Sequence, residues 1–419
     1  PFQLLECGVT ALMEQRNLSR ECCVEIPKLV VVVLAYHSRN SMPIFMDVFE
    51  EALLKNSTDG NSVQAESEDS IPSEWKANPF RVCAPILLIS QMLPDFDVIH
   101  SVIETADQLR RITRELIEDL VQDGVVYAEI RTTPRELVVG EHLTEKEGID
   151  VILDEIKQSE QRMGNRIIVR LLLSINRSEL RNPSPSNSFD REKALRVAQM
   201  AIDYKHAQES HVVGVDLVET QLFLSLLFHV QAAPFAYFKS SFDLLRLHGI
   251  PFVIHTGEVP DDRVLTSPCV CMTEDVGSFH DVRDILEAHP ARLGHALCLV
   301  DAGLKIIQSN EEKKIVEREQ IPIEICPTSN CMTLGLKSLH SHPVIMTLMK
   351  TTPTSINTDD MIVFDTHLSD EVWSIASFLQ WEVRDVVQYE QSIVDQILDE
   401  SDQVRSFILA RFERFLNSC

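Results

Sequence analysis

Five side chains with the chemistry of a hydrolytic metal site occur in order along the second half of the 419-residue sequence. They are His255, Glu258, His295, Asp359 and Asp360. Histidine nitrogens and carboxylate oxygens are ordinary ligands of catalytic Zn²⁺, and a separate glutamate can move a proton to or from a metal-activated water. Taken singly, such residues are common as structural groups or helix caps, so the argument requires that all five share one place in the fold.

Short apolar segments rich in β-branched residues precede these side chains, mostly separated by stretches long enough for a helix. Eight of them can be recognised, at residues 29–34, 125–131, 167–175, 212–217, 251–255, 292–295, 321–326 and 354–357. Near-continuous apolar strands that alternate with helices are typical of a parallel sheet covered by helices. Eight such segments predict an α/β protein, a (β/α)₈ TIM-type barrel, with a doubly wound open sheet as the alternative.

The loops that follow the strands of a parallel barrel gather at one end, where catalytic groups lie. Besides the five residues above, the segment ends carry Arg131 after the second segment, Asn176 and Arg177 after the third, and residues 326–330 after the seventh. We expect all of these side chains at one mouth of the barrel. Together they form the inventory of a mononuclear, metal-dependent hydrolase with a proton shuttle.

Two parts of the sequence show helical spacing of apolar residues. Ile112, Leu116 and Leu120 recur every four residues and predict a helix that leads into the second strand. The tail from residue 370 onward predicts further helices packed on the barrel, with apolar positions at Val372, Ile375, Leu379, Ile393, Ile397 and Phe407.

The domain organisation predicted from the sequence is a single barrel domain at residues 26–419, preceded by an extension at residues 1–25. The chain starts at Pro1 rather than Met, so we expect this extension to be truncated. A polar stretch at residues 56–78 and a second segment at residues 263–279 interrupt the alternation of apolar segments and helices. Both are predicted to be insertions.

The amino-acid composition limits the classes of molecule that the protein is expected to bind. The formal net charge of -26 repels polynucleotides and anionic membrane surfaces, so we expect neither as a partner. The ten cysteines are irregularly spaced, which indicates reduced thiols rather than a disulfide framework. The longest apolar runs fall well short of the roughly 18 residues of a membrane span. We expect a cytoplasmic monomer that binds a small molecule.

Four sequence strings resemble, in order, the motifs of the adenosine deaminase family. They are HTGE at residues 255–258, LGH at 293–295, CPTSN at 326–330 and SINTDD at 355–360. The string EIRTTP at residues 129–134 is most similar to the adenosine deaminase-like branch, whose members are associated with N6-methyl-AMP. The resemblance runs from about residue 93 to residue 371, and implies hydrolytic deamination of adenosine or an N6-substituted AMP to the inosine-type product.

The resemblance also implies one Zn²⁺ per chain and a role for each site residue. His255 and Asp359 would be metal ligands, Glu258 would protonate purine N1, and His295 would orient the attacking water and help to move its proton. Asp360 would hydrogen-bond purine N7.

Substrate binding is also expected at the ends of the second and third strands. Asn176 and Arg177 are the substrate-binding candidates, and either Arg131 or Arg177 could bind a phosphate through two parallel hydrogen bonds. The alternative is that either arginine pairs with a nearby carboxylate such as Glu129 or Glu179.

The sequence departs from the family at the first strand, where family members carry a His-x-His metal motif. Alignment from Pro27 places Val32 and Leu34 at the two histidine positions. A catalytic zinc normally has three protein ligands, so His255 and Asp359 alone would hold it weakly.

Three explanations for this departure stay open. The ligands are lost, which would leave a catalytically inactive deaminase-fold protein that binds a purine or a protein partner. His37 replaces one of them. Or the sequence is misspliced or mistranslated where similarity stops abruptly, after Leu29, Leu217 and Arg263.

Overall fold

The eight predicted strands pair side by side in the order in which they occur in the sequence. The computed structural model describes residues 20–34, 103–137, 142–177, 188–207, 211–218, 234–257, 279–299, 310–334, 336 and 338–418. Its strands are β1 (Lys28–Leu34), β2 (Val125–Thr132), β3 (Ile168–Asn176), β4 (Val212–Val218), β5 (Phe252–Thr256), β6 (Arg292–His295), β7 (Ile323–Ile325) and β8 (Thr354–Ile356).

Every neighbouring pair of strands is parallel, and the strand order is β1 to β8 without a reversal. Strand β8 lies beside β1, so the sheet curls into a nearly closed barrel. This confirms the (β/α)₈ prediction and rules out the doubly wound alternative, in which the strand order reverses at a switch point. Strand β7 is shorter than the predicted segment 321–326. It begins after Pro322, which has no N–H to pair, and ends before Cys326.

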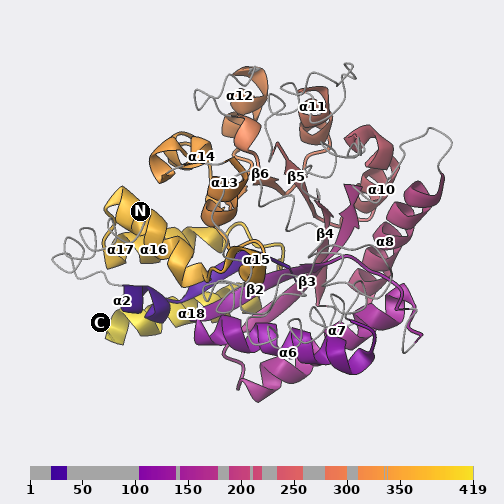
Figure 1. Cartoon of the computed structure of the whole chain (residues 1–419), viewed down its shortest axis with the longest axis horizontal. Helices are drawn as coiled ribbons and strands as arrows, with labels where there is room; N and C mark the ends of the chain where they lie inside the picture. Colours follow the sequence, from indigo (N-terminus) through magenta and orange to yellow (C-terminus); the bar gives the residue numbers. More distant parts are fainter. Residues whose placement is uncertain are drawn as a thin grey trace, which may run out of the picture.

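Helices surround the strands (Figure 1). They are α2 (Arg20–Glu25), α6 (Ala106–Gln122), α7 (Glu145–Arg162), α8 (Ser188–His206), α10 (Phe235–Leu247), α11 (Phe279–Glu287), α12 (Asn310–Glu319), α13 (Pro327–Leu334), α14 (Pro343–Met346), α15 (Met361–Phe364), α16 (Leu368–Leu379), α17 (Val383–Ile393) and α18 (Asp402–Ser418). Short 3₁₀ turns occur at Leu297–Leu299, Leu339–Ser341 and Leu348–Lys350. In the described part of the chain, no helix is both long and apolar enough to cross a membrane.

The helix predicted from four-residue spacing is α6. Its first turn is closed by a capping box, in which the side chains of Thr105 and Gln108 satisfy each other's backbone N–H groups. Ile112, Leu116 and Leu120 are buried against the barrel, as the spacing predicts.

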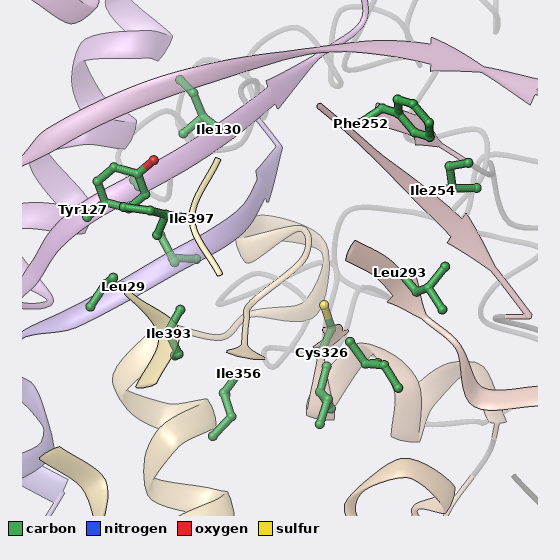
Figure 2. Packing of buried hydrophobic residues seen from close by; sticks show 14 of the residues in the cluster. Leu29, Tyr127, Ile130, Phe252, Ile254, Leu293, Cys326, Ile356, Ile393 and Ile397 are labelled. Atoms are coloured by element: carbon green, nitrogen blue, oxygen red, sulfur yellow. The ribbon is translucent and has the colours of Figure 1, made fainter. Parts of the chain in front are cut away.

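The helical prediction for the tail is confirmed for α16, α17 and α18 but is wrong at Ile397. That residue lies between α17 and α18, and it is buried in the same cluster as Leu29 and Tyr127 (Figure 2). The connection is held in place by the strands: the backbone N–H of Leu398 donates to Glu129 Oε1 at 2.6 Å, and Arg292 donates to the Gln396 carbonyl at 2.6 Å. The segment therefore enters the amino-terminal end of the barrel, where Arg292 is the first residue of β6.

The predicted insertion at residues 56–78 lies outside the described residues, as does the second insertion except for residue 279, where α11 begins. His37 also lies outside them. Of the predicted extension at residues 1–25, the structure describes only α2, whose Cys23 is buried in the hydrophobic core.

Candidate active site

Three of the predicted site residues converge at the carboxyl-terminal ends of β5, β6 and β8. The ring centroids of His255 and His295 are 5.2 Å apart, and His295 Nε2 lies 3.9 Å from Asp359 Oδ2. All three residues are buried, and so is Asp360, which follows Asp359. Glu258 lies outside the described residues.

The two other predicted residues lie at the same end of the barrel. Asn176 is the last residue of β3, and Arg177, which is only 2% exposed, follows it. Both sit where the loops of the barrel mouth begin, as the sequence predicts.

The backbone at the site is held in a conformation that most residues avoid. His295, Ala296 and Asp359 have φ angles of 58°, 52° and 57°, in the left-handed region. Such strain persists only where the surrounding structure enforces it, and it is frequent at functional sites. Gly294 allows the backbone of β6 to lie close to the His255 ring. A Cβ at this position would be only 2.9 Å from Cγ of His255.

His255 is oriented by a carboxylate that the sequence analysis did not select. Asp216, in β4, faces His255 Nδ1 with its Oδ1 at 3.0 Å, which leaves Nε2 as the nitrogen available to a metal. Burial alone would lower the pKa of His255, but Asp216 raises this pKa to about 9. The pair therefore favours a cation on His255, either a proton or a metal ion.

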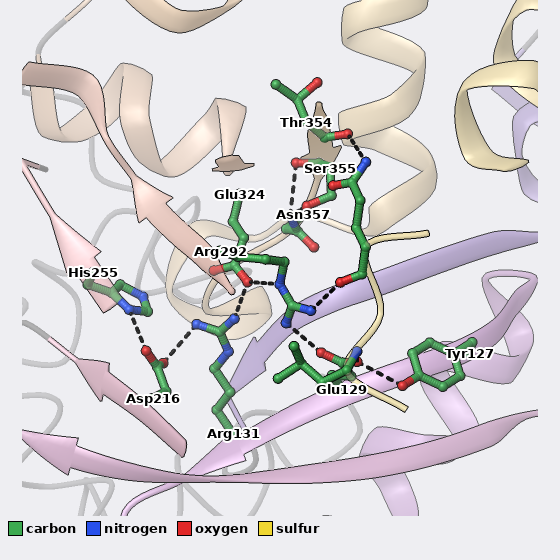
Figure 3. Close-up of polar contacts among 12 residues, drawn as sticks. Tyr127, Glu129, Arg131, Asp216, His255, Arg292, Glu324, Thr354, Ser355 and Asn357 are labelled. Atoms are coloured by element: carbon green, nitrogen blue, oxygen red, sulfur yellow. Dashed lines mark hydrogen bonds and ion pairs between the residues drawn. The ribbon is translucent and has the colours of Figure 1, made fainter. Parts of the chain in front are cut away.

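Arg131 is fully buried between the strands of the barrel, where Asp216 separates it from His255 (Figure 3). Its Nη1 donates to Asp216 Oδ2 at 2.7 Å and its Nη2 donates to Glu324 Oε1 at 2.5 Å. The suggestion that Arg131 binds a phosphate is therefore wrong. The alternative of a carboxylate partner is right, although the partners are Asp216 and Glu324 rather than Glu129.

A second arginine, Arg292, joins this network by sharing Glu324 with Arg131. Arg292 Nε donates to Glu324 Oε1 at 2.8 Å, and Arg292 Nη2 pairs with Glu129 Oε2 at 2.5 Å. Tyr127 donates to the other oxygen of Glu129 at 2.8 Å. A continuous chain of buried hydrogen bonds and ion pairs thus runs from Tyr127 to His255 (Figure 3).

The charges in this network do not balance without His255. Two guanidinium groups face three carboxylates, those of Glu129, Asp216 and Glu324. The excess negative charge lies next to His255, which is the physical reason for its affinity for a cation. The signal in the sequence is an ionisable residue inside an otherwise apolar strand, as in VVGVDLV of β4 and IEI of β7.

The string CPTSN supplies two groups that orient the site. Ser329 Oγ donates to Asp359 Oδ2 at 2.8 Å, and Asn330 Nδ2 donates to His295 Nδ1 at 2.8 Å. Both residues lie on α13, whose first turn is held by Glu371 of α16 through a bond of 3.1 Å from the Thr328 N–H. Burial raises the pKa of Glu371 to about 7.

The donor atoms in the described part of the chain fit Zn²⁺ in kind. Ligand atoms of His295, Cys326 and Asp359 lie within 4.8 Å of one another, and His255 directs Nε2 away from Asp216. Nitrogen, sulfur and oxygen are all zinc donors, and hydrogen-bonded support of His255 and Asp359 is usual for ligands. Val32 and Leu34 of β1 supply no donor atom.

Ser329→Ala is expected to weaken Zn²⁺ binding by roughly 10-fold or more, because Asp359 loses the hydrogen bond that fixes its ligand oxygen. A competition titration against a chromophoric chelator measures this change. Ser392→Ala, in α17, is the matched control because its hydroxyl bonds only the local Tyr389 carbonyl among the described residues. Equal zinc affinity for Ser329→Ala and the unaltered chain would remove Ser329 from the site.

Known proteins are similar to this chain in sequence. The chain is 28% identical to the adenosine deaminase of Mycobacterium avium over 319 residues, which cover 73% of this chain and 76% of that one. It is 26% identical to the N6-mAMP deaminase of Arabidopsis thaliana over 295 residues, which cover 66% and 70% of the two chains.

Solved structures share the fold. Arabidopsis ADAL complexed with IMP matches with a TM-score of 0.69 and 22% identity over 95% of this chain and 99% of that one. A Zn-bound amidohydrolase from Burkholderia ambifaria matches with a TM-score of 0.63 and 16% identity, over 95% and 94%. The model of the adenosine deaminase family matches residues 73–406 of the chain. The chain therefore belongs to the adenosine deaminase family of aminohydrolases.

Proposed function

We propose that this barrel is a zinc-dependent aminohydrolase that removes the 6-amino group of adenosine or of an N6-substituted AMP. The observation that carries the proposal is the convergence of His255, His295, Asp359 and Asp360 at one barrel mouth in a chain of this family. The IMP bound to Arabidopsis ADAL supports a purine nucleotide as ligand, and the Zn of the Burkholderia protein supports zinc.

The metal would be held by His255 Nε2 and a carboxylate oxygen of Asp359, which the resemblance to the family implies as ligands and which Asp216 and Ser329 orient. A zinc ion in such a site lowers the pKa of a bound water towards neutrality. Asp216 keeps the imidazole of His255 in one orientation, and Ser329 does the same for the carboxylate of Asp359.

The other side chains would act on the purine. Glu258 would deliver a proton to N1, so that negative charge does not accumulate on the ring when water adds to C6. His295 would hold the oxygen of the attacking water, and Asp360 would hydrogen-bond N7. The C6–N bond then breaks, and ammonia leaves from adenosine or an alkylamine leaves from an N6-substituted AMP.

A second candidate function is that of a catalytically inactive deaminase-fold protein that binds a purine or a protein partner. The observation that favours it is the presence of Val32 and Leu34 on β1 in place of two donors. Metal analysis of the purified chain separates the candidates: near-stoichiometric zinc supports the aminohydrolase, and absence of zinc under zinc-replete conditions supports the binding protein.

Glu258→Gln is expected to lower kcat for deamination by about 10²- to 10⁴-fold in a zinc-loaded chain, because glutamine keeps the shape but delivers no proton. KM should change little. Ammonia release from adenosine gives both constants, and Glu192→Gln, at an exposed position of α8, is the matched control. If Glu258→Gln retained most of the kcat, the assignment of Glu258 as the acid would be wrong.

We further expect a modest preference for the monophosphate over the nucleoside, with Arg177 as the phosphate-binding residue. Each charge-assisted hydrogen bond is worth about 1.5–3 kcal/mol, so Arg177→Ala should reduce kcat/KM for N6-methyl-AMP on the order of 10-fold or more. The value for adenosine should stay nearly constant. The net charge of -26 opposes this binding only weakly, since salt screens charges beyond about 8–10 Å. A preference for adenosine that Arg177→Ala leaves unchanged would contradict the expectation.

A further inference from the structure

We propose that a relay of hydrogen bonds from His342 through Asn330 fixes His295 as the tautomer with its hydrogen on Nε2. His295 then presents a hydrogen-bond donor to the mouth of the barrel and is not itself a metal ligand. The use of this donor to hold the attacking water rests on the proposed function, whereas the tautomer itself does not.

The relay begins at a backbone N–H, which can only donate. The N–H of Ile345 donates to His342 Nδ1 at 3.3 Å, at the start of α14. A neutral imidazole has one N–H. When Nδ1 accepts a hydrogen bond, that hydrogen must therefore be on Nε2. His342 is fully buried, and burial followed by the nearby His295 lowers the pKa of His342 to about 3, so its ring is neutral.

A second backbone N–H fixes the orientation of the Asn330 amide. The N–H of Cys326 donates to Asn330 Oδ1 at 3.3 Å, and His342 Nε2 lies 3.3 Å from the same oxygen. Both neighbours are donors, so the atom between them must be the amide oxygen. The amide nitrogen consequently faces His295.

The last bond of the relay sets the tautomer of His295. Asn330 Nδ2 lies 2.8 Å from His295 Nδ1, and an amide NH₂ can only donate. His295 Nδ1 therefore accepts, and the hydrogen of the neutral ring is on Nε2, the nitrogen that lies 3.9 Å from Asp359 Oδ2.

This tautomer excludes His295 from the metal shell. A ligand nitrogen needs a free lone pair, but Nε2 carries the hydrogen. For Nε2 to coordinate a metal, the Asn330 amide would have to turn over, which would break its contacts with Cys326 N–H and His342. Within the cluster of His295, Cys326 and Asp359, the relay therefore assigns His295 to the orienting role and leaves the other two as donors.

The test uses the full chain labelled with ¹⁵N at histidine, and two-bond ¹⁵N–¹H NMR correlations that report which ring nitrogen carries the hydrogen. The expected result is the Nε2–H tautomer for both His295 and His342, without zinc and with it. A His295 with its hydrogen on Nδ1, or a zinc-induced coordination shift at His295 Nε2, would overturn the proposal.

Asn330→Asp provides a second test, because the carboxylate presents only acceptors to His295. The expected result is the appearance of a hydrogen on His295 Nδ1, with the backbone N–H of Cys326 still able to donate to residue 330. Asn165→Asp, in an exposed turn, adds the same charge and should leave the His295 signals unchanged. An unchanged His295 tautomer in a folded Asn330→Asp chain would also overturn the proposal.

The activity of the chain is a separate readout. If the zinc-loaded chain deaminates adenosine, Asn330→Asp should lower kcat more than it changes KM, because the donor that holds the water is lost. An inactive chain with the Nε2–H tautomer at His295 would contradict the proposed function while confirming the relay.

Discussion

Introducing Val32→His and Leu34→His together is expected to raise the affinity of the chain for Zn²⁺ by more than about 100-fold. Removing one hydrogen bond to a metal ligand changes the affinity by about 10- to 100-fold, and two added ligands should change it more. Both positions belong to β1, where Leu34 pairs with Arg131 of β2 and the register shifts between Val30 and Val33. The first strand ends at the same mouth as His255 and Asp359, so two imidazoles there would complete a four-donor shell.

The measurement is competition with a chelator of known affinity, on the double variant, each single variant and the unaltered chain. Leu247→His, at a position 80% exposed on α10, is the control for a histidine away from the site. Tight, near-stoichiometric zinc in the unaltered chain would contradict the expectation, and would direct attention to Cys326 or His37 as the missing ligand. Comparing transcript with genome across codons 29–90 would distinguish true loss of the histidines from a misspliced segment.

Arg292→Met is expected to destabilise the fold by about 3–5 kcal/mol, because it removes one partner from a buried ion network and leaves uncompensated carboxylates. Arg292 is fully buried and pairs with Glu129 and Glu324. Methionine fills much of the volume of arginine. The fall in the free energy of unfolding should therefore come from the lost positive charge and not from an empty cavity. Urea unfolding followed by circular dichroism gives the free energy of unfolding.

The surface ion pair of Arg246 and Asp243 on α10 supplies the control. Both side chains are about half exposed, so Arg246→Met should cost no more than about 1 kcal/mol. Combining Arg292→Met with Glu129→Gln should recover part of the loss, which identifies the unpaired carboxylate as its source. A change below about 1 kcal/mol for Arg292→Met would mean that water or protonation already relieves these carboxylates.

The same network links stability to the site. Asp216 takes a hydrogen bond from Arg131 on one oxygen and faces His255 with the other, so the group that orients His255 belongs to the ion network of the barrel interior. Burial alone would raise the pKa of Asp216, but Arg131 and His255 hold that pKa below its ordinary value. The carboxylate thus stays ionised and can support a metal ligand.

The sequence by itself determined the alternation of strands and helices and the residues at the strand ends, whereas closure of the sheet into a barrel came from the strand order in the structure. Strands that are buried on both faces must be apolar throughout, and helices that cover them must carry an apolar stripe, so both are visible as local patterns. The residues that end each strand then follow from the segment boundaries, which is why His255, His295 and Asp359 were placed correctly. The family strings determined the chemistry expected of them.

Only the tertiary structure decided which charged side chains point into the barrel and what they pair with. Arg131 ends an apolar segment and was expected at the mouth, yet it is fully buried between the strands of the barrel, paired with residues 85 and 193 positions further along the chain. Arg292 likewise meets Glu129 across 163 positions. Partners this far apart meet only when the strands close round, and a buried charge is tolerated only if such a partner is present. The tautomer of His295 has the same origin, because it depends on the direction of two backbone N–H groups that the fold alone brings to Asn330 and His342.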